Sequence, residues 1–312
     1  MAAVVGRFAP SPSGYLHAGN LLAMLLAWLD CRSLGGELVF RMEDLDPARS
    51  RDCYREALAA DLRWFGLDWD RGWPDPAYAQ SRRSGFYEEA FRELEAQRLV
   101  YPCWCSRAER LAAASAPHEG EAQSDASCRC ARLDEAERRA RLESGRRPAW
   151  KLRLPDRTVT LTDGHYGPLS QNLQKSGDCI VRRADGVFAY QLAVCVDDLL
   201  MGVNRVVRGR DLLSSAPRQA WLIEKLGGTA PRYCHVPLLV SGGEKLAKRL
   251  GSLSTQELRA KTSPAALCGT LAQLCGLIDR PEPVTPRELL AVFSWARVKT
   301  EDVPFEGVFP QA

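Results

Sequence analysis

A short apolar segment followed by a loop rich in proline and glycine constrains the fold of this chain most strongly. Val4–Phe8 is β-branched or apolar and predicts a buried strand. Residues 9–19 hold two prolines and two glycines, which favour a loop because proline fixes φ and glycine tolerates positive φ. Asn20 is the expected N-cap of a helix over the apolar run Leu21–Leu29. A strand, a loop and a helix N-terminus in this order form an anion-binding arrangement, because N–H groups and the helix dipole face the ligand.

A second predicted strand, Glu37–Met42, follows that helix and completes a βαβ unit with parallel strands and a right-handed crossover. Ligands bind at the carboxyl ends of such strands. Arg7, at the end of the first strand, and Glu43, just past the second, are therefore expected at the same edge of the sheet. Arginine suits a carboxylate ligand because its planar donors bind one in bidentate fashion. The alternative is that Arg7 and Glu43 form a structural ion pair.

The βαβ pattern stops near Tyr101 and returns at Cys179, and between them lies a segment rich in cysteine, arginine and glutamate. We therefore predict an α/β chain whose Rossmann-like parallel sheet is split by a cysteine-bearing insertion and followed by a small helical C-terminal part. The expected parts are residues 1–101 and 179–237 for the two halves of the catalytic sheet, 102–178 for the insertion and 238–312 for the C-terminal part.

Four cysteines of the insertion occur in two closely spaced pairs. Cys103-x-Cys105 and Cys128-x-Cys130 offer four thiolates, the donor set of a tetrahedral structural zinc site. The spacing is tighter than the usual C-x2-C, so free thiols are the alternative. The chain has eleven cysteines in all, and this odd number without a secretory signal is typical of reduced thiols in a cytoplasmic protein.

Charge and hydropathy set weaker limits. The net charge of +3 arises from 42 basic and 39 acidic residues, which permits a nucleic-acid partner without arguing for one. The run Leu21–Leu29 is too short to cross a bilayer, so no membrane association is expected, and no obligate protein partner is evident. A basic cluster in the insertion could meet RNA phosphates, but its interleaved acidic residues favour a solvated helix. Its arginines are Arg138, Arg139, Arg141, Arg146 and Arg147.

Two motifs resemble those of class I aminoacyl-tRNA synthetases. Residues 17–20 read His-Ala-Gly-Asn where that family has His-Ile-Gly-His, and residues 7–14, Arg-Phe-Ala-Pro-Ser-Pro-Ser-Gly, resemble its glutamate-specific branch. Residues 245–249, Lys-Leu-Ala-Lys-Arg, resemble the family's Lys-Met-Ser-Lys-Ser loop, although Ala247 and Arg249 replace both serines. The alternatives are an ordinary βα loop with a chance histidine and a solvated pair of lysines.

The resemblance implies which side chains bind the substrates. His17 and Lys248 are the expected catalytic residues, because they would stabilise charge that develops on the phosphates of ATP. ATP would be bound by His17, Gly19, Asn20, Lys245 and Lys248. Glutamate would be bound by Arg7, Phe8, Ala9, Pro10, Ser11, Glu43, Tyr190 and Arg208. Asp197 and Asp198 would have a supporting role.

The resemblance also implies a reaction, in which ATP with Mg²⁺ activates L-glutamate to glutamyl-adenylate and the glutamyl group passes to RNA. The chain after Arg249 is too short for the helical anticodon-binding domain of a standard glutamyl-tRNA synthetase. It is therefore similar to truncated paralogues that activate glutamate without tRNA and transfer it to queuosine at the wobble position of tRNA(Asp). The second hypothesis is a compact enzyme that charges the 3′ end of tRNA(Glu), and the third is a silent paralogue that only binds RNA or a nucleotide.

The resembled subfamily binds one structural zinc through a Cys-x-Cys pair followed by a tyrosine and a cysteine four residues apart. Cys128 fits that last cysteine, but Ser124 stands at the tyrosine position. Cys130 or, less favourably, His118 could take the vacant place. We therefore expect one zinc per chain and leave its fourth ligand open.

Overall fold

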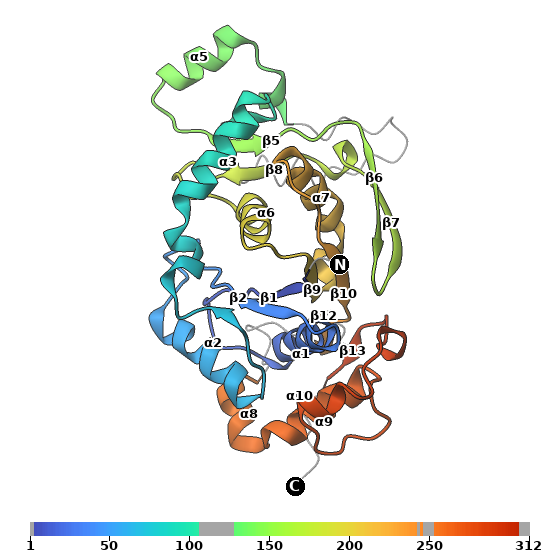
Figure 1. Cartoon of the computed structure of the whole chain (residues 1–312). Coiled ribbons are helices and arrows are strands. Elements are labelled where there is room, and N and C mark those ends of the chain that lie inside the picture. The colour runs from blue at the N-terminus through green and yellow to red at the C-terminus, as the bar shows by residue number, and fades with distance from the viewer. Residues whose placement is uncertain (1–2, 106–127, 242–243, 246–252, 306–312) are drawn as a thin grey trace.

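Two ladders of parallel strands run through the centre of the protein (Figure 1). The computed structural model describes residues 3–105, 128–241, 244–245 and 253–305. The ladders contain β1 (Val5–Phe8), β2 (Glu37–Phe40), β3 (Arg71–Gly72), β9 (Arg205–Gly209) and β10 (Arg232–Val236). β2 pairs in parallel with β1 and β3, and β9 pairs in parallel with β10. The two ladders meet where β1 lies beside β9, so the halves predicted from the sequence form one platform.

Helices cover both faces of this platform. They are α1 (Ala18–Ser33), α2 (Asp52–Trp64), α3 (Ser84–Ala96), α6 (Tyr190–Leu200) and α7 (Ala216–Lys225). Side chains alternate along the strands, as a period of two requires. Val39 and Val206 pack with α7 and with the segment just after α6 on one face, whereas Phe40 and Val207 pack with α1 on the other. The α/β architecture predicted from the sequence is therefore confirmed.

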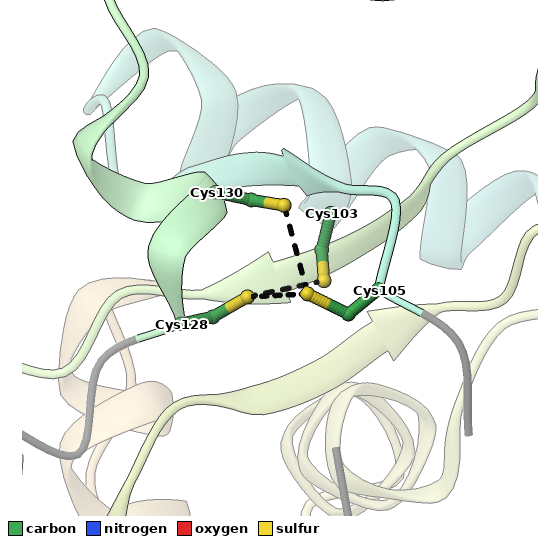
Figure 2. Close-up of side chains that lie close together, drawn as sticks. All are labelled: Cys103, Cys105, Cys128 and Cys130. Atoms are coloured by element: carbon green, nitrogen blue, oxygen red, sulfur yellow. Dashed lines mark hydrogen bonds between the residues drawn. The ribbon is translucent and has the colours of Figure 1, made fainter. Parts of the chain in front are cut away.

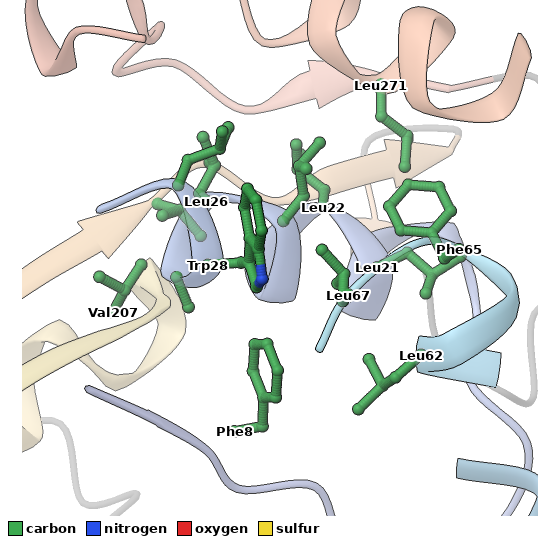
Figure 3. Packing of buried hydrophobic residues seen from close by; sticks show 14 of the residues in the cluster. Phe8, Leu21, Leu22, Leu26, Trp28, Leu62, Phe65, Leu67, Val207 and Leu271 are labelled. Carbon is green, nitrogen blue, oxygen red and sulfur yellow. The ribbon is translucent and has the colours of Figure 1, made fainter. Parts of the chain in front are cut away.

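The first helix is the centre of the largest core. Its leucines pack among side chains of β1, α2 and β9, and Leu271 of α9 (Pro264–Leu274) closes the cluster from the far side (Figure 3). Leu21, Leu25 and Leu29 are fully buried, and each such side chain contributes roughly 1.5–3 kcal/mol by leaving water. The C-terminal part thus shares one core with the N-terminal βαβ unit.

That helix begins earlier than the sequence suggested. It starts at Ala18, and His17 rather than Asn20 is its N-cap. Asn20 occupies the third helical position, where its side-chain oxygen accepts a hydrogen bond from the backbone N–H of His17. The prediction of Asn20 as N-cap was wrong because a histidine ring nitrogen can also accept from a helix N-terminus.

The insertion has its own antiparallel sheet. β4 (Val100–Cys103) pairs with β5 (Ala149–Leu152), and β5 pairs with β8 (Cys179–Arg182). The expectation that the segment from Cys179 resumes the parallel sheet is therefore wrong for β8, although it holds for β9 and β10. A helix, α5 (Glu135–Glu143), projects at the far end with no buried residue, and a hairpin of β6 (Thr158–Asp163) and β7 (Gly167–Asn172) returns to lie along β10 (Figure 1).

The described residues of the C-terminal part form helices that lie below α1 in Figure 1 and a small sheet. Its elements are α8 (Thr255–Lys261), α9, α10 (Pro286–Leu289), β11 (Leu239–Ser241), β12 (Glu244–Lys245) and β13 (Val303–Pro304). Across the described residues, no helix combines the length and the apolar character needed to span a membrane. The boundaries of the four predicted parts remain predictions.

Candidate active site

A pocket of about 490 Å³ opens at the carboxyl ends of β1, β2 and β9. All the residues predicted to bind glutamate line it: Arg7, Phe8, Ala9, Pro10, Ser11, Glu43, Tyr190 and Arg208. Asn20, predicted to bind ATP, also lines it. The lining also includes residues that no sequence pattern singled out, among them Ser13, Met24, Ala27, Gly209 and Leu212. The structure thus brings residues from positions 7 to 212 to one cavity at the edge where a parallel sheet binds its ligands.

His17 lies beside this pocket at the N-terminus of α1. Its Nδ1 accepts a hydrogen bond from the backbone N–H of Gly19 at 3.2 Å. The proton of a neutral ring is therefore on Nε2, which can donate to an oxygen atom of a ligand. The chain around His17 is held from the C-terminal side, because Leu16 accepts a hydrogen bond from the backbone N–H of Thr255.

Three hydrogen bonds hold the guanidinium of Arg208 in the wall of the pocket. Its Nε donates to Nε2 of His235 at 3.0 Å, and its Nη1 donates to Oε1 of Gln219 at 2.7 Å. Its Nη2 donates to the backbone oxygen of Leu212 at 3.2 Å, and the guanidinium lies 5.1 Å from the ring centroid of Tyr233. Described residues thus use three of its five N–H groups, and the other two can donate to a ligand.

A fully buried arginine, Arg41, organises the acidic side of the pocket. Its Nη1 lies 2.6 Å from Oδ1 of Asp198, and its Nη2 lies 3.1 Å from Oε1 of Glu43. Its Nε lies 3.8 Å from Oδ2 of Asp197. The supporting role of Asp197 and Asp198 remains a prediction, and Arg41 was not among the residues that the sequence singled out. Asp197 also accepts a hydrogen bond from Tyr87, which fixes it against α3.

Arg7 does not form the structural ion pair with Glu43 that the sequence left open. Its Nη1 donates to the backbone oxygen of Val207 at 2.9 Å, and its Nε lies 3.8 Å from Asp198. Burial raises the pKa of Glu43 above its usual value, even though Arg41 and Arg7 oppose the shift. A cationic group that entered the pocket would therefore be stabilised by this carboxylate and would favour its ionised form.

Tyr190 is the first residue of α6 and lies between these charges. Burial and the nearby Glu43 carboxylate raise the pKa of its hydroxyl, so the group stays neutral and can donate a hydrogen bond. Lys245 is in β12 and its side chain is not described, and Lys248, His118 and Ser124 lie outside the described residues. The roles of the site residues remain predictions.

The four cysteines of the insertion converge on one point (Figure 2). All their sulfur atoms lie within 4.8 Å of one another. Sγ of Cys105 lies 3.1 Å from that of Cys128 and 3.7 Å from that of Cys130, and Sγ of Cys103 lies 3.5 Å from that of Cys128. A tetrahedron with Zn–S bonds of about 2.3 Å requires sulfur atoms about 3.8 Å apart. The donor set and its dimensions therefore fit one zinc ion, with Cys130 in the place that the sequence left open.

Comparisons with known proteins identify the family. The family model for the catalytic domain of class I tRNA synthetases of the E and Q type matches residues 3–287. A protein of Symbiobacterium thermophilum named glutamyl-Q tRNA(Asp) synthetase is 49% identical over 96% of this chain and 94% of its own length. The chain belongs to the glutamyl-Q tRNA(Asp) synthetase family. It is a ligase of the aminoacyl-tRNA synthetase type, as the two sequence motifs predicted.

Other members and a solved structure agree with this family. The protein of the same name in Nitratidesulfovibrio vulgaris is 47% identical over 95% of this chain and 93% of its own length. The crystal structure of a glutamate tRNA ligase from Elizabethkingia meningosepticum in complex with its amino acid superposes with a TM-score of 0.81. That ligase is 26% identical to this chain, and the match covers 67% of the ligase. Class I synthetases use ATP, so the family also accounts for the predicted nucleotide.

Proposed function

We propose that this protein activates L-glutamate with ATP and Mg²⁺ and transfers the glutamyl group to queuosine at the wobble position of tRNA(Asp). The observation that carries the proposal is the pocket itself. Arg208 and Arg7 present cationic donors at one end, while Glu43 presents a carboxylate nearby. This arrangement suits an amino acid whose side chain is an anion and whose ammonium group is a cation.

In the proposed reaction, Arg7 and Arg208 bind the side-chain carboxylate, and Glu43 binds the ammonium group. The α-carboxylate then attacks the α-phosphorus of ATP, and pyrophosphate leaves. His17 donates from Nε2 to a phosphate oxygen, and Lys248 adds a positive charge as charge develops on the phosphates. The protein contributes mainly by positioning the two substrates and by this electrostatic stabilisation. We expect it to act in the cytoplasm, as the sequence predicts.

Two other functions compete with this proposal. A compact glutamyl-tRNA synthetase is disfavoured because two relatives named glutamyl-Q tRNA(Asp) synthetase are 49% and 47% identical to this chain, whereas the glutamate tRNA ligase is 26% identical. A silent paralogue would have no reason to keep an arginine fork oriented towards a pocket that also holds Glu43 and Tyr190.

The acceptor decides among these functions. Incubation of the protein with ATP, Mg²⁺ and radiolabelled glutamate is expected to label tRNA(Asp) that contains queuosine. The same tRNA without queuosine, and tRNA(Glu), are expected to stay unlabelled. Digestion with a guanosine-specific ribonuclease should place the label in the anticodon fragment. Label at the 3′ end of tRNA(Glu) would support the compact synthetase, and absence of glutamate-dependent ATP–pyrophosphate exchange would support the silent paralogue.

We further propose that Cys103, Cys105, Cys128 and Cys130 bind one structural zinc that holds β4 and the start of the α5 segment together. Elemental analysis of the purified protein is expected to give about one zinc per chain, because four thiolates closed around Zn²⁺ bind it tightly. The double substitution of Cys103 and Cys105 by serine should remove the metal. Cys53→Ser, at an exposed cysteine outside the cluster, is the control and should keep it. Zinc absent from the unmodified protein would end this proposal.

A further inference from the structure

All the hydrogen-bond partners of Arg208 are uncharged acceptors. They are an imidazole nitrogen of His235, an amide oxygen of Gln219 and a backbone oxygen of Leu212. In the part of the chain that the structure describes, no carboxylate forms an ion pair with Arg208. Arg41, by contrast, is surrounded by the carboxylates of Glu43 and Asp198. The positive charge of Arg208 is therefore left for a ligand.

The hydrogen bond to Arg208 determines the tautomer of His235. A guanidinium N–H can only donate, so Nε2 of His235 must accept, and the ring proton is on Nδ1. Nδ1 lies 2.7 Å from Oδ2 of Asp163, to which it donates. His235 is fully buried, and this burial together with the charge of Arg208 lowers the pKa of its ring despite the neighbouring carboxylate. The ring is therefore neutral in the tautomer that orients Arg208.

Asp163 is itself held in one orientation. Its Oδ1 accepts hydrogen bonds from the backbone N–H groups of His165 at 3.0 Å and Tyr166 at 2.9 Å. Its Oδ2 is thereby left facing His235. Both residues are buried where water cannot replace these partners. The order Asp163, His235, Arg208 is thus a chain of hydrogen bonds with a single consistent direction of donation.

Asp163 belongs to the segment that the sequence assigned to the insertion. It is the last residue of β6, and the next residue, Gly164, donates its backbone N–H to the oxygen of Tyr233 at 2.8 Å. A Cβ atom at position 164 would lie 2.2 Å from Sγ of Cys234, so only glycine permits this close approach. Tight packing against β10 therefore brings the end of β6 to His235, which in turn contacts the pocket residue Arg208.

We propose that Asp163 and His235 are positioning residues that orient Arg208 without neutralising it and so make the pocket select an anionic side chain. A carboxylate placed directly on Arg208 would orient it equally well but would offset its charge. A neutral imidazole orients the guanidinium, and the carboxylate that fixes the imidazole is one ring further away. The inference rests on the proposed glutamate activation. It adds Asp163, a residue of the insertion, to the residues that act on the glutamate side chain.

Asp163→Asn is the sharpest test. The backbone donors at Oδ1 require an oxygen there, so the amide group of asparagine would face Nδ1 of His235 and donate to it. The ring proton would then move to Nε2 and face the Nε–H of Arg208. Two donors would meet there, so the hydrogen bond that orients Arg208 would be lost. We expect the KM for glutamate in ATP–pyrophosphate exchange to rise about 10- to 100-fold with a smaller change in kcat. Asp156→Asn, an exposed carboxylate in the loop before β6, is the matched control and should behave as wild type.

Two further measurements distinguish positioning from a general loss of structure. The ¹⁵N spectrum of histidine-labelled wild-type protein should show His235 as the neutral tautomer with the proton on Nδ1. His235→Gln can accept from Arg208 and donate to Asp163, so its KM should remain closer to that of wild type than the KM of His235→Leu. An imidazolium or an Nε2-protonated ring in wild type, or equal losses in the two His235 variants, would overturn the inference.

The outcome also separates this inference from the proposed function. If wild-type protein activates glutamate and Asp163→Asn has an unchanged KM, the inference alone fails. If wild-type protein shows no glutamate-dependent exchange, the proposed function fails and the selection of glutamate by this chain of residues fails with it.

Discussion

Replacement of Arg208 by alanine is expected to lower kcat/KM for glutamate-dependent ATP–pyrophosphate exchange by about 100- to 1000-fold. Removal of one partner from a buried, hydrogen-bonded charge pair costs about 2–5 kcal/mol, and each 1.4 kcal/mol corresponds to tenfold in rate. Arg208 is 6% exposed and its charge has no carboxylate partner among the described residues, so its attraction for a ligand carboxylate is little screened. Most of the loss should appear as a higher KM for glutamate.

The controls separate loss of binding from loss of fold. Arg208→Lys keeps the charge but not the planar fork, so its activity should fall between those of alanine and arginine. Arg232→Ala removes an exposed arginine from the neighbouring strand and should leave exchange within about twofold of wild type. Thermal unfolding of each variant checks its fold. Arg208→Ala with wild-type kinetics would contradict the assignment of this pocket to the side-chain carboxylate.

Replacement of Arg41 by alanine is expected to destabilise the protein by about 3–5 kcal/mol. Arg41 is fully buried, and its loss would leave Asp198, Glu43 and Asp197 without their shared cation. Removal of one partner from a buried ion pair leaves an uncompensated buried charge, which explains the size of the effect. The free energy of unfolding from urea titration measures it. Arg92→Ala, at an exposed arginine of α3, should change stability by about 0.5 kcal/mol or less.

The loss of stability in the Arg41→Ala protein should depend on pH. Burial already raises the pKa of Glu43 in the folded protein, and loss of Arg41 removes the group that most opposes this shift. A carboxyl whose folded pKa lies above its unfolded value favours folding below the unfolded pKa and loses that contribution as pH rises through the folded pKa. The deficit of the Arg41→Ala protein relative to wild type should therefore be smaller at about pH 5 than at about pH 7. A loss below about 1 kcal/mol at both values would mean that the carboxylates find other partners.

Much of the pocket could be predicted because its residues lie in local patterns. Residues 7–11 form the end of β1 and the start of the loop after it, and Glu43 follows the next strand, so the topology of a βαβ unit places them together. The two cysteine pairs, Cys103 with Cys105 and Cys128 with Cys130, are also local patterns, because their short spacing is visible in the sequence. The structure brings both pairs to one point. The family resemblance added Tyr190 and Arg208, which no local pattern joins to residue 7.

Other features escaped because their determinants are distant in the chain. Arg41 lay inside the predicted strand Glu37–Met42 and comes directly after β2 in the structure, where its three acidic neighbours reveal its function in the core. His235 is the next-to-last residue of β10, close to the ligand edge of the sheet, a position that could have marked it as a candidate. β8 was placed in the wrong sheet because a short apolar strand does not encode the direction of its partner.

The amino-acid sequence by itself determined the strand, loop and helix of the first unit, the four cysteines of the proposed zinc site and the residue types that line the pocket. Each depends on neighbours in the chain or on a motif with a short spacing. Only the tertiary structure decided how Arg208 is held. Pairing of β9 with β10 places His235 opposite Arg208, and close packing of Gly164 against Cys234 brings Asp163 to His235. Burial and the direction of hydrogen bonds set the charge and the tautomer of these groups, and both depend on contacts between distant segments.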